Sequence, residues 1–212
     1  MTNAAKPQAY TLPLVRLSLT MPFVEELVRR KIDPDSVLSS NGLARQTVGD
    51  PSVFVPAIVV HRFVEDAAHA ADDPYLGVCV GEALDLSGWP PFLDAVAHSS
   101  MLIDLLVRFI QAVKDQATSA HHTLEITQDH ALFKEVRVST PDISPAQNDA
   151  FTAAYTLKLI RRGAGQDWDP KQVRVKVCAP EARPSRYRGG NVVGGARWGM
   201  VVGFPPQGFR GR

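Results

Sequence analysis

HHTLEITQDHALFKEVRV, residues 121–138, is the stretch that decides the fold. Apolar and polar residues alternate on both sides of a short polar segment, 128–130, which is typical of two β-strands joined by a turn. The segment contains no glycine, although the tightest hairpin turns favour one. The alternation divides the second strand into two faces: Leu132, Lys134, Val136 and Val138 on one, and Phe133, Glu135 and Arg137 on the other. The stretch predicts a β-hairpin.

The chain before this hairpin has helical periodicity almost throughout. Prolines and capping residues near the expected starts predict helices over 22–30, 34–39, 56–72, 74–83 and 101–117, with a short one after the turn at 88–91. We expect Thr20 to cap the first helix and Ser99 or Ser100 to cap the helix over 101–117. Gly77 and Gly81 share one helix face, which permits close approach by another backbone.

The chain after the hairpin predicts one more helix and two more strands. The helix covers 144–163, with Ser144 as its N-cap. In the strand over 173–180, Val173, Val175 and Val177 alternate with charged residues and should face the core. The last strand covers 197–204. The sequence therefore predicts an α+β fold, with a helical N-terminal half packed with a small, mostly antiparallel sheet in the C-terminal half.

The length of 212 residues suits one domain with a substantial core. We expect a disordered lead-in over 1–9, a single domain over 10–205 and a frayed end over 206–212. Hydrophobic residues make up 45% of the chain and the net charge is +1, so the chain lacks the basic character of a DNA-binding domain. No apolar run is long enough for a membrane span, and the predicted location is the cytoplasm.

The motifs that would indicate a metal site or an enzyme are missing from the sequence. Six histidines and two cysteines occur, but none has the compact spacing of zinc ligands. No G-x-S-x-G, G-x-G-x-x-G or Walker pattern is present. We therefore predict no cofactor, no metal and no enzymatic activity. Cys79 and Cys178 each lie in an apolar stretch and are expected to behave as small buried hydrophobes.

Four stretches are similar to a known domain type: DDPYLGVCVGEAL (72–84), AVAHSSMLIDLLVRFIQAVKDQ (95–116), LEITQDHALFKEVRV (124–138) and GQDWDPKQVRVKVCAPE (165–181). They resemble the N-terminal, arabinose-binding-like effector domain of AraC-type transcription regulators of the ornithine-utilisation kind. The last stretch is the most specific, because Trp168, Pro170 and the spacing to the strand at Val173 all agree. Met101 departs from the pattern, and so does the glycine-rich region 186–200.

The resemblance implies a ligand-sensing regulatory domain that binds a small-molecule effector. In such regulators a helix-turn-helix domain follows and reads the DNA, and it is not found in this chain. Either an excised piece or a naturally short protein would have this form. Self-association is a further expectation, because these regulators read paired half-sites, and the apolar stripe on helix 101–117 is a candidate surface unless it is core. The alternative function is a stand-alone interaction or dimerisation protein without a ligand.

The effector is expected between the helical half and the sheet. Small-molecule pockets are largely apolar and carry a few placed polar groups. The predicted ligand-binding residues are aromatic or imidazole side chains: Trp89, His98, Phe109, Phe133 and Tyr155. Simple filling of the core is the competing explanation for the aromatic ones.

Overall fold

The predicted hairpin forms in the computed structural model, which describes residues 12–89, 92–165, 169–182, 192–194 and 199–206. Strands β3 (Ala120–Ile126) and β4 (Ala131–Arg137) pair antiparallel, with Leu124 opposite Phe133. Three further strands complete the sheet: β5 (Arg174–Val177), β6 (Val192–Gly194) and β7 (Gly199–Phe204). The order is β3-β4-β7-β5-β6, and only β5 and β6 pair parallel among these strands. The mostly antiparallel sheet and the α+β class are confirmed.

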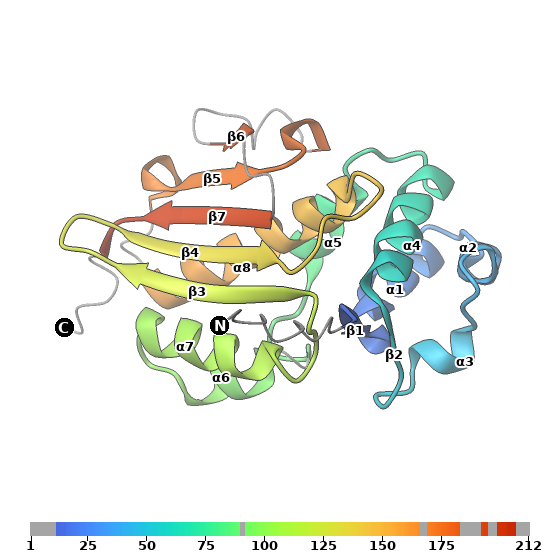
Figure 1. Cartoon of the computed structure of the whole chain (residues 1–212), viewed down its shortest axis with the longest axis horizontal. Coiled ribbons are helices and arrows are strands. Elements are labelled where there is room, and N and C mark those ends of the chain that lie inside the picture. The colour runs from blue at the N-terminus through green and yellow to red at the C-terminus, as the bar shows by residue number, and fades with distance from the viewer. Residues whose placement is uncertain (1–11, 90–91, 166–168, 183–191, 195–198, 207–212) are drawn as a thin grey trace, which may run out of the picture.

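Helices cover one face of this sheet (Figure 1). Helix α8 (Ala146–Ala164) lies behind the strands, and α5 (Leu76–Ala83) packs on α8. Helices α6 (Leu93–His98) and α7 (Leu102–Val113) lie beside β3. The predicted core face of β5 is confirmed, because Val173, Val175 and Val177 are all buried.

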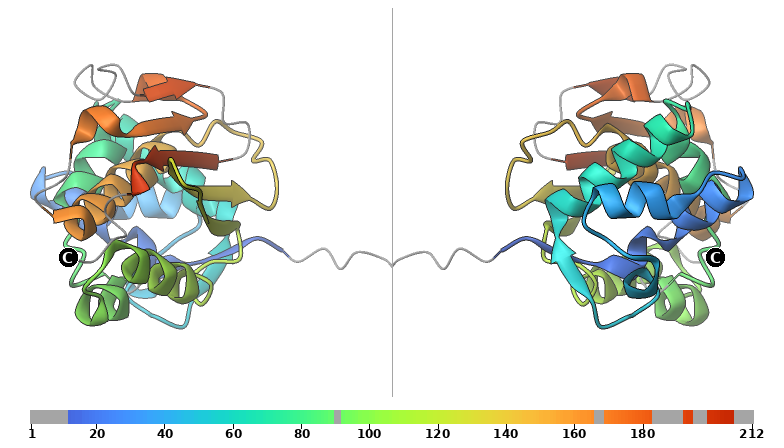
Figure 2. Two further views of the ribbon diagram at one scale, coloured as in Figure 1. Left: turned by 90° about the vertical axis from the view of Figure 1, so that its left-hand side faces the viewer. Right: turned by 90° about the vertical axis from the view of Figure 1, so that its right-hand side faces the viewer.

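The remaining elements form a second group beside the sheet (Figures 1 and 2). In chain order they are β1 (Leu14–Arg16), the 3-10 turn η1 (Leu17–Thr20), α1 (Met21–Arg29), α2 (Pro34–Ser40), α3 (Arg45–Val48), β2 (Phe54–Pro56) and α4 (Ala57–Ala70). Strand β1 pairs with β2, and its backbone also bonds to the segment after α7: Arg16 N–H donates to the Gln116 carbonyl at 2.8 Å. These bonds join the two groups.

The close approach predicted for the two glycines of α5 is confirmed. A Cβ on Gly81 would lie 2.7 Å from the Phe151 carbonyl oxygen and 2.7 Å from the Ala154 Cβ. A Cβ on Gly77 would meet the Gln147 backbone. Since real Cβ atoms do not approach this closely, α5 and α8 can pack in this way only because these side chains are absent.

Of the three predicted N-caps, only Thr20 stands at the predicted position, and it makes no capping hydrogen bond. The prediction of Ser144 is wrong, because α8 begins at Ala146 with Pro145 at the N-cap. Helix α7 begins at Leu102 with Met101 at the N-cap, and neither Ser99 nor Ser100 caps it. Thr20 does precede α1, but its hydroxyl donates to the Leu17 carbonyl at 2.7 Å instead of capping the helix. The carbonyl that accepts this hydrogen bond belongs to the 3-10 turn η1, which directly precedes the helix. Helix α7 also ends at Val113, before the expected 117.

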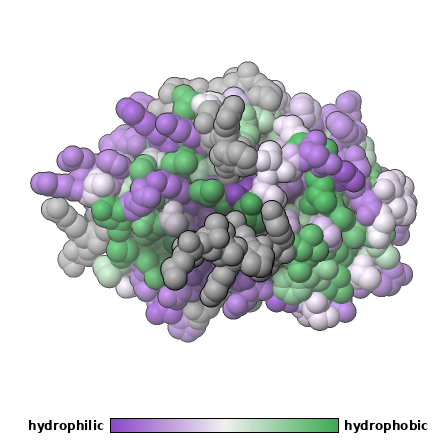
Figure 3. All heavy atoms as spheres, viewed as in Figure 1, coloured by the Kyte–Doolittle hydropathy of each residue, from purple (hydrophilic) through white to green (hydrophobic). Residues whose placement is uncertain are grey.

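A single large core links the two groups. It runs from Leu17 in η1 to Phe204 in β7, and it includes the stripe of α7, where Leu106 is fully buried and Phe109 nearly so. That stripe is therefore core and not a free surface. The outward side of the sheet carries apolar and polar side chains interleaved (Figure 3). The lead-in over 1–9 and the end over 207–212 lie outside the described residues, as does Trp168.

Candidate functional site

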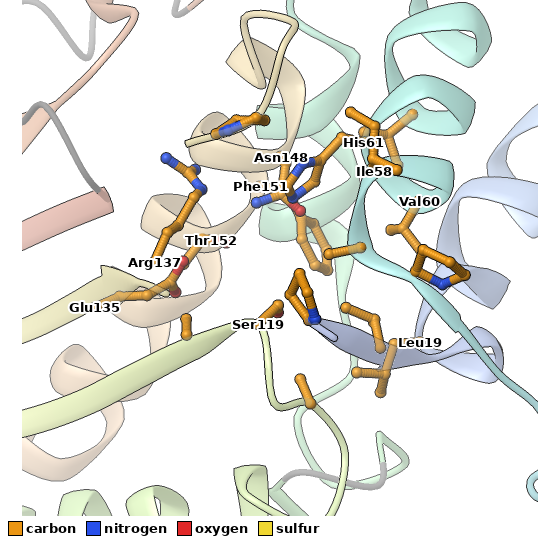
Figure 4. A pocket seen from close by; sticks show the side chains of 18 of the residues that line it. Leu19, Ile58, Val60, His61, Ser119, Glu135, Arg137, Asn148, Phe151 and Thr152 are labelled. Carbon is orange, nitrogen blue, oxygen red and sulfur yellow. The ribbon is translucent and has the colours of Figure 1, made fainter. Parts of the chain in front are cut away.

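A cavity of about 420 Å³ lies where the two groups of elements meet (Figure 4). Its walls come from β1, β2, α1 and α4 on one side and from β3, β4 and α8 on the other. Much of the lining is apolar; examples are Val15, Leu19, Phe23, Ile58, Val60, Val64 and Phe151. Pockets for small organic ligands have volumes from about 300 Å³ upward, so this cavity is large enough for one.

Polar side chains line part of the cavity, mostly on the side of β3, β4 and α8. These side chains come from four different elements: His61 of α4, His122 of β3, Glu135 and Arg137 of β4, and Asn148, Thr152 and Tyr155 of α8. Two periodicities bring them together. Glu135 and Arg137 are two residues apart, so they share one face of strand β4. Asn148, Thr152 and Tyr155 are three or four residues apart, so they share one face of helix α8.

The β4 pair faces inward, which reverses the usual arrangement for a strand. Glu135 is 7% and Arg137 8% exposed, whereas Val136 between them is 42% exposed. Burying two ionised side chains requires partners, because a lone charge in an apolar interior is very costly. Each of the two has one.

Glu135 is paired with a histidine of the neighbouring strand. Its Oε2 lies 3.3 Å from His122 Nε2, and both side chains are at most 9% exposed. Burial alone would raise the pKa of this carboxyl group, but the hydrogen bond from His122 and the electrostatic interactions with His122 and Arg137 outweigh it and lower the pKa. Glu135 is therefore an ionised carboxylate at neutral pH. Its second oxygen, Oε1, has no hydrogen-bond partner among the described residues.

Arg137 forms a close ion pair with Asp149 of α8. Both side chains are almost completely buried, at 6% and 2% exposure. Arg137 Nη1 also lies 3.7 Å from Cys178 Sγ. The pair fastens the end of β4 to the first turn of α8, so it positions both polar elements of the cavity wall.

Two lining residues hold polar atoms without a partner. His61 is 8% exposed, and its Nδ1 has no hydrogen-bond partner; Trp89 Nε1 has none either. Burial, together with the nearby charge of Arg137, lowers the pKa of His61 to about 4, so the ring is neutral. An unsatisfied buried polar atom costs about 1–3 kcal/mol, so both side chains contribute unfavourably to stability beside the cavity.

An aromatic cluster closes the inner end of the cavity. The ring centre of Trp89 lies 5.7 Å from that of Phe151 and 5.4 Å from that of Tyr155. Burial and the charge of Glu135 raise the pKa of Tyr155 well above its ordinary value, although its hydrogen bond with Thr152 acts in the opposite direction. Tyr155 is therefore a neutral phenol.

Of the five residues predicted from the sequence, Trp89 and Tyr155 line the cavity. Phe109 and Phe133 do not; they lie fully buried behind its wall, where Phe109 stands 5.6 Å from the His122 ring and 6.3 Å from the Tyr155 ring. His98 is the exposed last residue of α6 and does not line the cavity. Whether any of the five binds an effector stays a prediction.

Sequence reasoning missed the residues that give the cavity its polar lining, namely His61, Glu135 and Arg137. A signal for the last two was present. One face of the predicted second strand contained Phe133 with both charges, and a face that carries a large aromatic side chain tends to be the buried one. Nothing in the pattern around His61 separates it from a surface histidine.

A second hollow, of about 550 Å³, lies on the other side of Trp89, between α1 and the end of α5. Although its volume is larger, its buried carboxylate is already satisfied: Glu26 accepts hydrogen bonds from Arg29 at 2.6 and 2.7 Å and from Arg30 at 2.6 Å. These contacts, with that of Arg29 the strongest, lower the pKa of Glu26 despite its burial. The first cavity is therefore the better candidate.

The described part of the chain also limits other kinds of site. It contains no group of three or more histidine, cysteine or acidic side chains that could hold a metal ion. Cys79 and Cys178 are both half-buried and form no disulfide with each other. None of the helices in that part is long and apolar enough to cross a membrane.

Comparison with protein families gives one match that covers residues 32–206, described as the arabinose-binding domain of AraC transcription regulators, N-terminal. The chain belongs to this family. The AraC N-terminal domain is a regulatory domain and not a class of enzyme. A comparison with curated proteins finds no match.

Two solved structures are similar to this AraC N-terminal domain. One is the transcriptional regulator CdpR from Pseudomonas aeruginosa, with a TM-score of 0.62 and 13% identity over 92% of this chain. The chain spans 56% of that regulator's length. The other is described as "Modulating Heme Redox Potential Through Protein-Induced Porphyrin Distortion", with a TM-score of 0.53, 13% identity and coverage of 93% of this chain and 97% of that one. At this identity both likenesses show the fold alone.

Proposed function

We propose that this AraC N-terminal domain is a sensor that binds a small-molecule effector in the cavity between α4 and the sheet, and passes the change to a DNA-reading domain of a full regulator. The observation that carries the proposal is the cavity itself, a partly open space of about 420 Å³ whose lining is largely apolar and carries a few polar side chains such as Glu135, Asn148 and Thr152. Family membership supports the regulatory role. The ornithine-utilisation subfamily stays a prediction.

The position of the cavity supports a physical route for signalling. One wall is built from the N-terminal group and the other from β4 and α8, and an exposed ion pair joins the two walls, with Arg62 3.1 Å from Asp142. A ligand that contacts both walls stabilises one arrangement of the two groups over others. It thereby shifts the population towards the arrangement that it binds better.

Thermal melting with a panel of amino acids, sugars, amines and fatty acids tests the proposal. A ligand at 100 times its Kd stabilises the folded state by about 2.7 kcal/mol, which raises the Tm of a domain of this size by about 5–11 °C. Ser119 points into the cavity, so Ser119→Trp should fill it and abolish the shift. Ser39→Trp on the exposed side of α2 is the matched control and should keep it. An equal shift in both variants would contradict the proposal.

Self-association is a second candidate function, and exposed apolar side chains on α6, on α7 and between them favour it. Leu93 of α6 and Val107 of α7 are 50% and 40% exposed, and Met101 between the two helices is 41% exposed. Sedimentation velocity over a hundredfold range of concentration should reveal a dimer that Val107→Glu weakens. A monomer at every concentration would contradict this proposal.

A further inference from the structure

The charges of the cavity wall indicate which class of ligand it accepts. Among the described residues that line the cavity, both arginines already have carboxylate partners: Arg137 has Asp149, and Arg62 has Asp142. An anionic ligand would therefore have to displace a carboxylate from a guanidinium. For Arg137 this displacement would take place in an almost fully buried site, where unpaired charges are costly.

Glu135 is in the opposite situation. Its one hydrogen-bonding contact in the described part of the chain is a histidine at 3.3 Å, on one of its two oxygens. An ionised carboxylate has room for several donors, and buried carboxylates are stabilised strongly by charged ones. The wall thus has an acceptor with spare capacity, and its guanidinium groups are occupied.

The aromatic end of the cavity fits the same class of ligand. Trp89, Phe151 and Tyr155 line it together. Tyr155 lies close enough to Glu135 for the carboxylate charge to raise the pKa of the phenol. Cations bind the faces of such rings, most strongly that of tryptophan. The neutral His61, whose Nδ1 has no partner, adds no positive charge to repel a cation.

From this geometry we infer that the cavity takes an amphipathic organic amine, with its ammonium group on Glu135 and its apolar body against Phe23, Phe151 and the aliphatic wall. This inference rests on the proposed function, because it assigns a ligand class to the same cavity. The alternative classes, hydrophobic carboxylates and neutral alcohols, are separate outcomes of the test.

Three probes of matched length separate these classes: 4-phenylbutylamine, 4-phenylbutan-1-ol and 4-phenylbutanoate. Each is titrated at pH 7.5 into the full chain carrying the neutral fluorescent probe N-phenyl-1-naphthylamine, with the melting midpoint as a parallel readout. We expect the amine to bind at least about tenfold more tightly than the alcohol, as for a charge-assisted hydrogen bond, and the carboxylate to bind most weakly. A carboxylate that binds as well as the amine would overturn the inference. So would an amine that causes neither displacement nor a shift.

Variants test the role of Glu135 itself. Glu135→Gln should weaken amine binding at least about tenfold and change alcohol binding less than about threefold. The matched control is Asp142→Asn, which removes a carboxylate from the exposed rim of the same cavity and should leave the ranking of the probes unchanged. An unchanged ratio of amine to alcohol affinity in Glu135→Gln would overturn the inference. If that variant does not fold, the order of the three probe affinities on the unsubstituted chain still tests the inference.

Failure of the inference and failure of the proposed function give different results. If the carboxylate or the alcohol binds best and Ser119→Trp abolishes its binding, the cavity is a ligand site of another chemistry. If the probes bind Ser119→Trp as tightly as the unsubstituted chain, the cavity is not the ligand site, and the proposed function fails with the inference.

Discussion

The buried ion pair between β4 and α8 gives the most quantitative prediction. Replacing Asp149 with alanine leaves the Arg137 guanidinium in a site where its side chain is 6% exposed. Breaking a buried pair from one side costs about 3–5 kcal/mol, because an uncompensated charge stays behind. For a domain of this size, 1 kcal/mol corresponds to about 2–4 °C in Tm, so Asp149→Ala should lower the Tm by about 6–20 °C.

The assay is a double-mutant cycle with thermal or urea unfolding of Asp149→Ala, Arg137→Met and the double variant. The double variant should be more stable than Asp149→Ala alone, because it removes the stranded charge as well. The matched control is the exposed pair of Arg62 and Asp142, whose side chains are 54% and 68% exposed; breaking it should cost at most about 1 kcal/mol. A cost below about 1 kcal/mol for Asp149→Ala, or strictly additive single effects, would refute the reasoning.

Two further predictions concern packing and pH. Gly81→Ala should destabilise the domain by about 1–3 kcal/mol, because the added methyl group overpacks against Ala154. The control is Gly49→Ala, whose added Cβ would meet no atom nearer than 3.9 Å and should change stability by less than about 0.5 kcal/mol. Equal effects of the two variants in urea unfolding would contradict the close packing. Below pH 6.5 the unfolded chain protonates His61 while the folded chain, with a pKa of about 4, does not. The free energy of unfolding should therefore fall by up to about 3 kcal/mol between pH 6.5 and 4. His61→Leu should lack this part of the dependence on pH. An identical dependence of stability on pH in the two proteins would show that His61 is not buried as a neutral ring.

The fold could be predicted largely from local patterns. The valines of β5 alternate with charges, so the pattern shows both the strand and its core face. The hairpin of β3 and β4 and the close contact at Gly77 and Gly81 were also predicted, because alternation and missing side chains are local properties. The helix caps were predicted less well, since a 3-10 turn occupies the Thr20 hydroxyl and competing local geometry is not visible in residue types.

The candidate site could be predicted only in part. A cavity lies between the helices and the sheet, where the effector was expected, and Trp89 and Tyr155 line it; binding of an effector there stays a prediction. The inward direction of Glu135 and Arg137 was not predicted, because β4 carries apolar and charged residues on both faces. Which face is buried depends on partners that are distant in sequence, Asp149 of α8 for Arg137 and His122 of β3 for Glu135.

A crystal structure of the chain with the tightest-binding compound from the melting panel tests the central claim most directly. The account predicts that the compound lies in the cavity between α4 and the sheet, in contact with Phe151 and within hydrogen-bonding distance of Glu135 or His61. A compound bound in the hollow beside α1, against Met21 and Glu25, with the cavity unchanged, would contradict it.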